Sequence, residues 1–184
     1  MAAARAAGHE VLLGIPMEPA NFPLNDPGPR ALMTGNPQSE NMARLAWILA
    51  RGSGYVGVTN AASAVLRGER FMASQEATRP VFEVLRERGL LFIEARPGER
   101  PPTVLPSRAA DVVVDERMSR PEIESRLADL ERLAKERGVA LGIAGPTLLT
   151  LERLAAWSKG VEFRGAVLAP VSAVVVRPTA QARP

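Results

Sequence analysis

Polar side chains that could do chemistry stand where the predicted strands of this sequence end. They are Glu18, Asn60, Glu94, Arg96, Asp115 and Glu116. Because sites in parallel α/β proteins form at the carboxyl ends of strands, carboxylates there could act as acid and base or hold a hard cation. We predict Glu94 and Asp115 as catalytic residues. The predicted substrate-binding residues are Glu18, Asn60 and Arg96. The alternative for each carboxylate is a structural role, satisfied in its loop by backbone N–H groups or by an arginine.

The residue types that most often carry catalysis are scarce, since the chain has 1 His and no Cys. His9 lies about seven residues before Pro16, roughly 20 Å along an extended strand, so we predict a structural role for it. A Ser-His-Asp triad is excluded, and a catalytic zinc site is not expected from one imidazole and no thiolate. We therefore predict no metal and no cofactor, unless a segment upstream of Met1 supplies ligands for a divalent cation.

A glycine motif near the second predicted strand has a structural interpretation. Gly52, Gly54 and Gly57 fit the G-x-G-x-x-G spacing of dinucleotide-binding proteins. That fingerprint must follow a strand and open a helix, whereas this one ends a helix and enters a strand. We interpret it as a helix C-cap followed by a closely packed strand glycine.

The composition narrows the range of partners. The 184 residues include 23 basic and 20 acidic ones, a net charge of +3, and only 4% are aromatic. Arg and Glu alternate along the predicted helices instead of clustering, so we predict no nucleic-acid partner. The N-terminus does not read as a signal peptide, and the longest apolar run, 165–176, is too short to span a bilayer.

The positions of apolar residues, Gly and Pro predict alternating helices and strands. Helices are expected over 2–7, 39–51, 75–88, 119–137 and 147–160, and strands over 11–15, 55–59, 90–94, 111–115, 139–143 and 166–176. Loops are expected over 18–37, 60–71 and 96–108. The near-continuous apolar strands predict a parallel α/β sheet covered on both faces. We expect a single domain over residues 1–176 and a flexible tail over 177–184.

The clearest predicted helix is the one over residues 119–137. Ser119 and Glu122 have capping-box spacing, and an apolar stripe runs along one face. The pairs Glu122/Arg126 and Glu131/Lys135 have i,i+4 spacing. We interpret these charges as a solvated face and not as a binding patch.

Six segments resemble the divergent polysaccharide deacetylase family, relatives of the NodB-type carbohydrate esterases. They read GHEVLLGIPMEP (8–19), NDPGP (25–29), YVGVTNAASA (55–64), LLFIEAR (90–96), DVVVD (111–115) and GIAGPTLLTLERLAAW (142–157). The resemblance implies a distorted, incomplete (β/α) barrel with a largely parallel sheet. It also implies a carbohydrate partner, such as a glycan or peptidoglycan-like polymer, and a place in the periplasm or cell envelope, although this chain shows no export signal.

The departures from the family pattern concern its histidines. The resemblance places a His where this chain has Gly14, a second where Ala61 follows Asn60, and a third at Gly145. It also implies an opening strand with an Asp pair, expected upstream of Met1 and missing here. The resemblance makes these residues the metal ligands, and we expect the small residues in their place to leave an empty pocket.

Three hypotheses remain open at the level of the sequence. The first is a degenerate deacetylase-like domain that binds carbohydrate or serves the cell envelope. The second is an active metal-dependent deacetylase that combines carboxylate ligands with upstream residues. The third is a non-catalytic interaction module, for which a missing first strand would leave a sheet edge open to pairing in a homodimer.

Overall fold

The computed structural model describes residues 1–62 and 67–178, which form two compact units. The first contains Met1–Glu94, Arg100–Arg108 and the chain from Val175; the second contains Ala95–Glu99 and Ala109–Val174. Each unit has a hydrophobic core of its own. The single domain over 1–176 stays a prediction. Residues 179–184 of the predicted flexible tail lie outside the described residues. Residues 63–66 also lie outside them.

The first unit is built on a four-stranded sheet in the order β1-β2-β3-β4. The strands are β1 (Leu12–Gly14), β2 (Gly57–Thr59), β3 (Leu91–Glu94) and β4 (Ser107–Ala109). β2 pairs in parallel with β1 and with β3, so that Val58 lies between Leu13 and Phe92. The predicted fold class is confirmed: the chain is α/β with a parallel sheet, and its described strands form no closed barrel.

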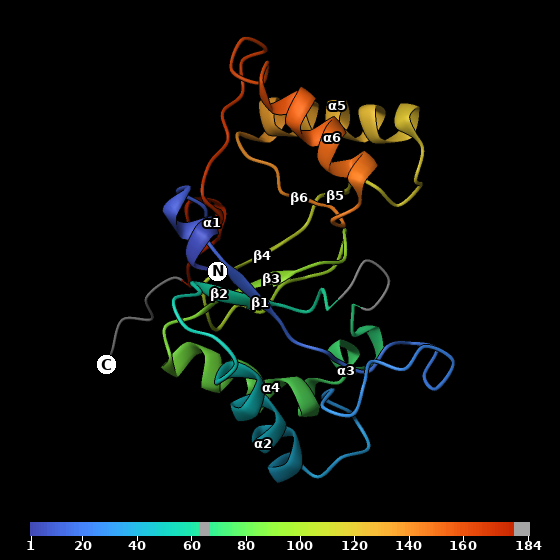
Figure 1. The fold of residues 1–184 in the computed structure, drawn as a ribbon. Coiled ribbons are helices and arrows are strands. Elements are labelled where there is room, and N and C mark those ends of the chain that lie inside the picture. The colour runs from blue at the N-terminus through green and yellow to red at the C-terminus, as the bar shows by residue number, and fades with distance from the viewer. Residues whose placement is uncertain (63–66, 179–184) are drawn as a thin grey trace. The chain divides into compact units, whose positions relative to one another are not determined.

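Helices of the first unit supply most of its core. They are α1 (Ala2–Ala6), α2 (Gln38–Leu49), α3 (Glu69–Ala73) and α4 (Gln75–Glu87). Figure 1 shows α2 and α4 next to each other on one side of the sheet. Phe82 of α4 meets Phe92 of β3 edge to face, with ring centroids 5.1 Å apart. The predicted N-cap Ser39 is wrong by two residues, because Pro37 precedes the helix and its carbonyl accepts from Glu40 N and Asn41 N.

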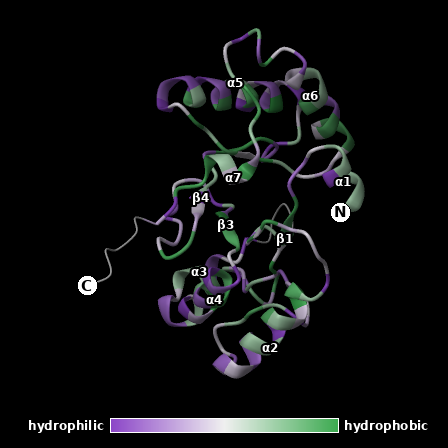
Figure 2. Ribbon diagram, turned by 90° about the vertical axis from the view of Figure 1, so that its left-hand side faces the viewer, coloured by the Kyte–Doolittle hydropathy of each residue, from purple (hydrophilic) through white to green (hydrophobic). Residues whose placement is uncertain are grey.

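The second unit combines a strand pair with two long helices. β5 (Val112–Val113) pairs in parallel with β6 (Gly142–Ile143), and α5 (Arg120–Arg137) lies beside α6 (Leu148–Ser158) in Figure 1. Polar and apolar residues alternate around α5 (Figure 2), as an amphipathic helix requires. Thr147 caps α6 as predicted, accepting from Thr150 N at 3.2 Å. The capping box of α5 is not formed, because the Ser119 side chain makes no cap hydrogen bond.

Three sequence predictions of secondary structure are wrong or incomplete. The loops predicted over 60–71 and 96–108 contain the start of α3 and of β4. The strand predicted over 166–176 is instead a short helix, α7 (Val171–Val174), followed by one bridge between Ser107 and Val176. Pro170 explains this change, since proline cannot donate to a strand ladder and readily precedes a helical turn. None of the described helices is long and apolar enough to cross a membrane.

Of the glycines of the G-x-G-x-x-G match, Gly57 is the closely packed strand glycine that the sequence predicts, whereas the predicted glycine C-cap is wrong, because Ala50 caps α2. Gly54 has a left-handed φ of +71°, and Gly57 lies in β2. A Cβ on Gly57 would lie 2.4 Å from the carbonyl oxygen of Leu91 and 2.5 Å from its Cγ. The close approach of β2 and β3 therefore requires glycine at position 57.

Replacing Gly57 tests this packing. We expect Gly57→Ala to lower the free energy of unfolding by about 1–3 kcal/mol, because the added methyl group overlaps the backbone of β3. Gly35→Ala is the matched control, since a Cβ there has nothing within 4 Å and the backbone is not left-handed; it should change stability by less than about 1 kcal/mol. Urea denaturation followed by circular dichroism measures both, and equal effects would contradict the packing argument.

Candidate functional site

The exit of β1 is fastened to the loop that follows it. Leu32 N donates to Pro16 O, and Glu18 N donates to Leu32 O, both at 2.9 Å. Met17 and Leu32 form a parallel bridge, and both side chains are buried. The Pro-Met-Glu-Pro segment is therefore fastened beyond the end of β1, and it fixes the position of the Glu18 carboxylate.

Glu18 is a buried carboxylate with protein partners on both oxygens. Its Oε2 accepts from Thr34 N and Thr34 Oγ1, both at 2.6 Å, and its Oε1 accepts from Arg70 at 3.3 Å. The Glu18 side chain is 6% exposed. Burial alone would raise the pKa of Glu18, but the hydrogen bonds from Thr34 and the charge of Arg70 outweigh it and hold the pKa below its ordinary value.

Asn60 and Glu94 come into direct contact at the ends of β2 and β3. Asn60 Nδ2 donates to Glu94 Oε1 at 2.7 Å and to Arg67 O at 2.8 Å, and both side chains are completely buried. The start of α3 also contacts Glu18, because Arg70 N and Phe71 N donate to Glu18 O. Glu18, Asn60 and Glu94, three of the predicted site residues, are therefore linked through the segment 67–71, and all three are buried.

The space beside Gly14 is filled by backbone. A Cβ on Gly14 would lie 2.9 Å from the carbonyl oxygen of Ala61 and 3.6 Å from Ala62 Cα. Ala61 is held there because its N–H donates to Thr59 Oγ1 at 3.2 Å. The expectation of an empty pocket at this position is therefore wrong: the chain after β2 occupies the space that a side chain at position 14 would need.

The other predicted site residues belong to the second unit. Asp115, which is 9% exposed, accepts at Oδ2 from Gly145 N at 2.7 Å and from Thr150 Oγ1 at 2.9 Å. Arg96 forms an ion pair with Glu99 at 3.9 Å, and Glu116 is exposed. Asp115 thus ties the end of β5 to the start of α6, using the N–H of a residue where the resemblance implies a histidine.

These residues do not fit a resident metal ion. Within residues 1–62 and 67–178, no group of three or more His, Cys, Asp or Glu side chains could hold one. Glu18 already accepts three hydrogen bonds, from Thr34 and Arg70, and Asp115 accepts two on one oxygen. We therefore derive no chemical step through a metal.

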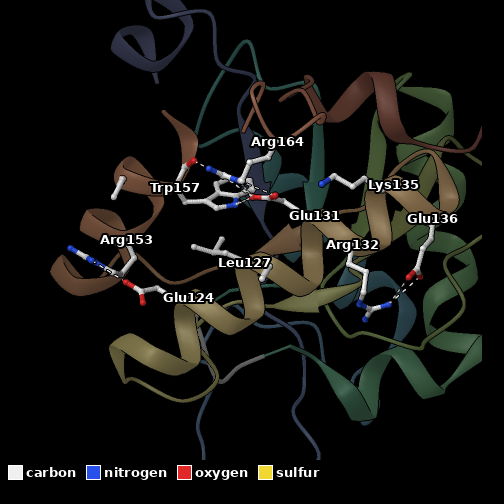
Figure 3. A pocket seen from close by; sticks show the side chains of 11 residues that line it. Glu124, Leu127, Glu131, Arg132, Lys135, Glu136, Arg153, Trp157 and Arg164 are labelled. Atoms are coloured by element: carbon white, nitrogen blue, oxygen red, sulfur yellow. Dashed lines mark hydrogen bonds and ion pairs between the residues drawn. The ribbon is translucent and has the colours of Figure 1, made fainter. Parts of the chain in front are cut away.

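Sequence reasoning missed a pocket of about 530 Å³ between α5 and α6 (Figure 3). Its lining residues are Glu124, Leu127, Ala128, Glu131, Arg132, Lys135, Glu136, Arg153, Ala156, Trp157 and Arg164. Glu131 is 9% exposed and accepts from Trp157 Nε1 at 2.5 Å and from Arg164 Nε at 2.8 Å. The solvated Glu131/Lys135 pair predicted from the sequence is therefore wrong. The signal that could have found Glu131 is its position one turn after Leu127, on the buried stripe.

Glu131 of α5 forms hydrogen bonds with Trp157 of α6 and with Arg164 in the turn after α6. The hydrogen bond from Arg164 lowers the pKa of Glu131, burial opposes this shift, and Trp157 adds to the lowering. The neighbouring charges are also paired, Arg132 with Glu136 and Arg153 with Glu124. This arrangement stabilises the helix pair, and it leaves no pair of converging carboxylates for catalysis among the residues drawn in Figure 3.

Comparison with known proteins gives a consistent result. The family model described as divergent polysaccharide deacetylase matches residues 1–175. No curated protein matches the chain. The crystal structure of the uncharacterized protein ATU2773 from Agrobacterium tumefaciens C58 is similar, with 35% identity and a TM-score of 0.87. The alignment covers 95% of this chain and 72% of that one.

The buried network around Glu18 predicts a stability that depends on pH. We expect Glu18→Gln to lower the free energy of unfolding by about 1–3 kcal/mol at pH 7, because charge-assisted hydrogen bonds are lost. Since the folded pKa lies below the ordinary value of 4.5, this stabilisation is present above that pH and is lost as pH falls through the folded pKa. The difference between wild type and variant should therefore shrink below about pH 4.5.

Urea denaturation at several pH values measures the effect. Glu83→Gln is the matched control, because Glu83 is 48% exposed and pairs with Arg79 on the surface of α4. It should cost less than about 0.5 kcal/mol at any pH. A Glu18→Gln cost that stays constant down to pH 3 would contradict the assigned role.

The hydrogen bonds of Glu131 predict that two substitutions on α5 have unequal effects on stability. Glu131→Gln should lower the free energy of unfolding by about 1.5–3 kcal/mol, since it weakens bonds to Arg164 and Trp157. Glu136→Gln should cost less than about 0.5 kcal/mol, because the Glu136 side chain is 53% exposed. Thermal denaturation followed by circular dichroism compares them; equal costs would restore the solvated-face interpretation.

Proposed function

Because the chain belongs to the divergent polysaccharide deacetylase family, we propose that it is a deacetylase-like domain that binds carbohydrate without metal-dependent hydrolysis. The observation that carries the proposal is the close contact at Gly14, where a backbone carbonyl lies 2.9 Å from the position of a Cβ. The family resemblance puts an imidazole at this position. No side chain fits there unless the chain after β2 moves.

The chemistry of deacetylation explains why this contact matters. A metal-dependent deacetylase uses a cation to polarise the acetyl carbonyl and to lower the pKa of its bound water. The resemblance assigns three imidazoles to that cation. At the corresponding positions this chain has Gly14 against a backbone carbonyl, Ala61 as the residue that fills the space, and Gly145 as a hydrogen-bond donor to Asp115.

The remaining polar residues at the strand exits favour a structural role over acid–base chemistry. Glu18, Asn60 and Glu94 are almost fully buried and bonded to other protein groups. Their catalytic or substrate-binding assignments, and those of Asp115 and Arg96, stay predictions. In the proposed function each of these side chains holds its own strand exit in place, and the surface above the exits of the first unit contacts the glycan.

The proposed partner is a glycan or peptidoglycan-like polymer of the cell envelope. This choice is supported by the family, whose description names a polysaccharide as the substrate class. The alternatives of an active enzyme completed by upstream residues, and of an interaction module that forms a homodimer, are outcomes of the experiments below.

Binding and acetate release separate these alternatives. We expect the protein to bind N-acetylglucosamine oligomers or acetylated xylan saturably in isothermal titration calorimetry, and to release no acetate with or without Mn²⁺ or Zn²⁺. Acetate release that a chelator abolishes and a divalent cation restores would contradict the proposal. Absence of glycan binding, together with a concentration-dependent dimer in solution, would favour the interaction module.

A Gly14→His variant tests the observation that carries the proposal. We expect it to unfold at a lower urea concentration than wild type and to gain no acetate release, because the imidazole cannot be placed without moving Ala61. Gly35→His is the control in open space and should leave stability nearly unchanged. Metal-dependent activity in Gly14→His alone would show that the scaffold still accepts a ligand at this position.

A further inference from the structure

Two arginines share one exposed tryptophan on the surface of the first unit. Trp47 lies in the last turn of α2 and is 41% exposed. The guanidinium carbon of Arg51 is 4.5 Å from the centroid of the Trp47 ring, and that of Arg30 is 5.1 Å from it. Arg51 follows Trp47 by one helical turn, whereas Arg30 comes from the loop after β1, so two separate segments bring their cations to one ring.

Neither guanidinium has a carboxylate partner among residues 1–62 and 67–178, in contrast to many arginines of this chain. Arg44 pairs with Glu40, Arg79 with Glu83, and Arg132 with Glu136. For the guanidinium groups of Arg30 and Arg51, the only partner within the described residues is the Trp47 ring. A guanidinium stacked on an aromatic face keeps its N–H donors at the edge of its plane, where they can reach a ligand.

The two positive charges also repel each other. Both lie within one Debye length, about 8 Å at physiological ionic strength, of the same ring centroid. The end of α2 offsets part of this cost for Arg51, because a helix C-terminus carries partial negative charge. An anion bound near both guanidinium groups would weaken this repulsion and accept hydrogen bonds from their N–H donors.

The chemistry of these groups specifies the ligand. Arginine binds carboxylate in a bidentate geometry that matches its planar donors. The Trp47 ring lies next to both guanidinium groups and so positions them for such a ligand. We infer that Arg30, Trp47 and Arg51 form a binding site for the carboxylate-bearing sugars of an acidic polysaccharide. That the ligand is a sugar rests on the proposed function. That the ligand is an anion rests on the two guanidinium groups, which have no carboxylate partner among the described residues.

Titration with two matched oligosaccharides tests the site. The probes are oligogalacturonate and its carboxyl-reduced, neutral counterpart, each titrated into the full chain by calorimetry. We expect tighter binding of the acidic probe and weakening as salt concentration rises. The double variant Arg30→Gln/Arg51→Gln should lose at least about tenfold in affinity. Arg79→Gln is the matched control, since its side chain is 81% exposed, and should change affinity by less than about twofold.

Nuclear magnetic resonance localises the binding independently of affinity. The chain has 2 Trp residues, so two indole N–H signals are expected. The signal of Trp47 should shift with oligogalacturonate, while that of Trp157, which donates to Glu131, should not. Unchanged melting of the double variant shows that any loss is not due to unfolding.

The outcomes separate this inference from the proposed function. Equal affinity for the acidic and the neutral probe, unaffected by the double variant, would overturn the inference and leave carbohydrate binding intact. Equally tight binding of single-stranded DNA would overturn it as well, since the site would then be a general polyanion surface. Absence of binding to either oligosaccharide, and to the acetylated glycans above, would contradict both.

Discussion

The buried carboxylate of Glu18 connects the parts of the first unit that meet at the end of β1. Its side chain accepts from Thr34 in the loop after β1 and from Arg70 in α3, while its backbone carbonyl accepts from Arg70 and Phe71. A buried charge without such partners would cost several kcal/mol. The loop 19–37 and the start of α3 must therefore keep their positions as long as Glu18 remains ionised. The strand exit is fixed by electrostatics as well as by Pro16 and Pro19.

Under the proposed function, rigidity at this exit would let the family fold persist without the histidines that the resemblance implies. Gly14 allows the turn after β2 to approach β1, and Ala61 occupies the space that a larger residue would fill. Asn60 and Glu94 satisfy each other below that turn. Within the described residues, Gly14, Asn60 and Ala61 thus each have a packing or hydrogen-bonding role at the ends of β1 and β2. These contacts can keep a carbohydrate-binding surface rigid, as the proposed function requires.

Much of the fold could be predicted from local patterns, while the failures involve partners distant in sequence. Gly8, Gly89 and Gly138 each adopt a positive φ just after a helix, so the helix ends could be located from glycines alone. The contact of Asn60 with Glu94 follows from parallel register, because Thr59 pairs with Ile93 and the next residue of each chain segment lies beside the other. The sequence could not reveal that Glu131 meets Arg164, because that contact depends on how α6 turns back on α5. The same limit applies to 166–176, where an apolar run has strand composition but Pro170 favours a helical turn.

The central claim is that the strand exits of this chain hold a structural network in place of a metal site. Its most direct test is the metal content of the protein after incubation with Mn²⁺, Co²⁺ or Zn²⁺ and removal of free ions, measured by inductively coupled plasma mass spectrometry. The account predicts far less than one ion per chain, with no change in Glu94→Ala or Asp115→Ala. One tightly bound ion per chain, lost in either variant, would contradict it.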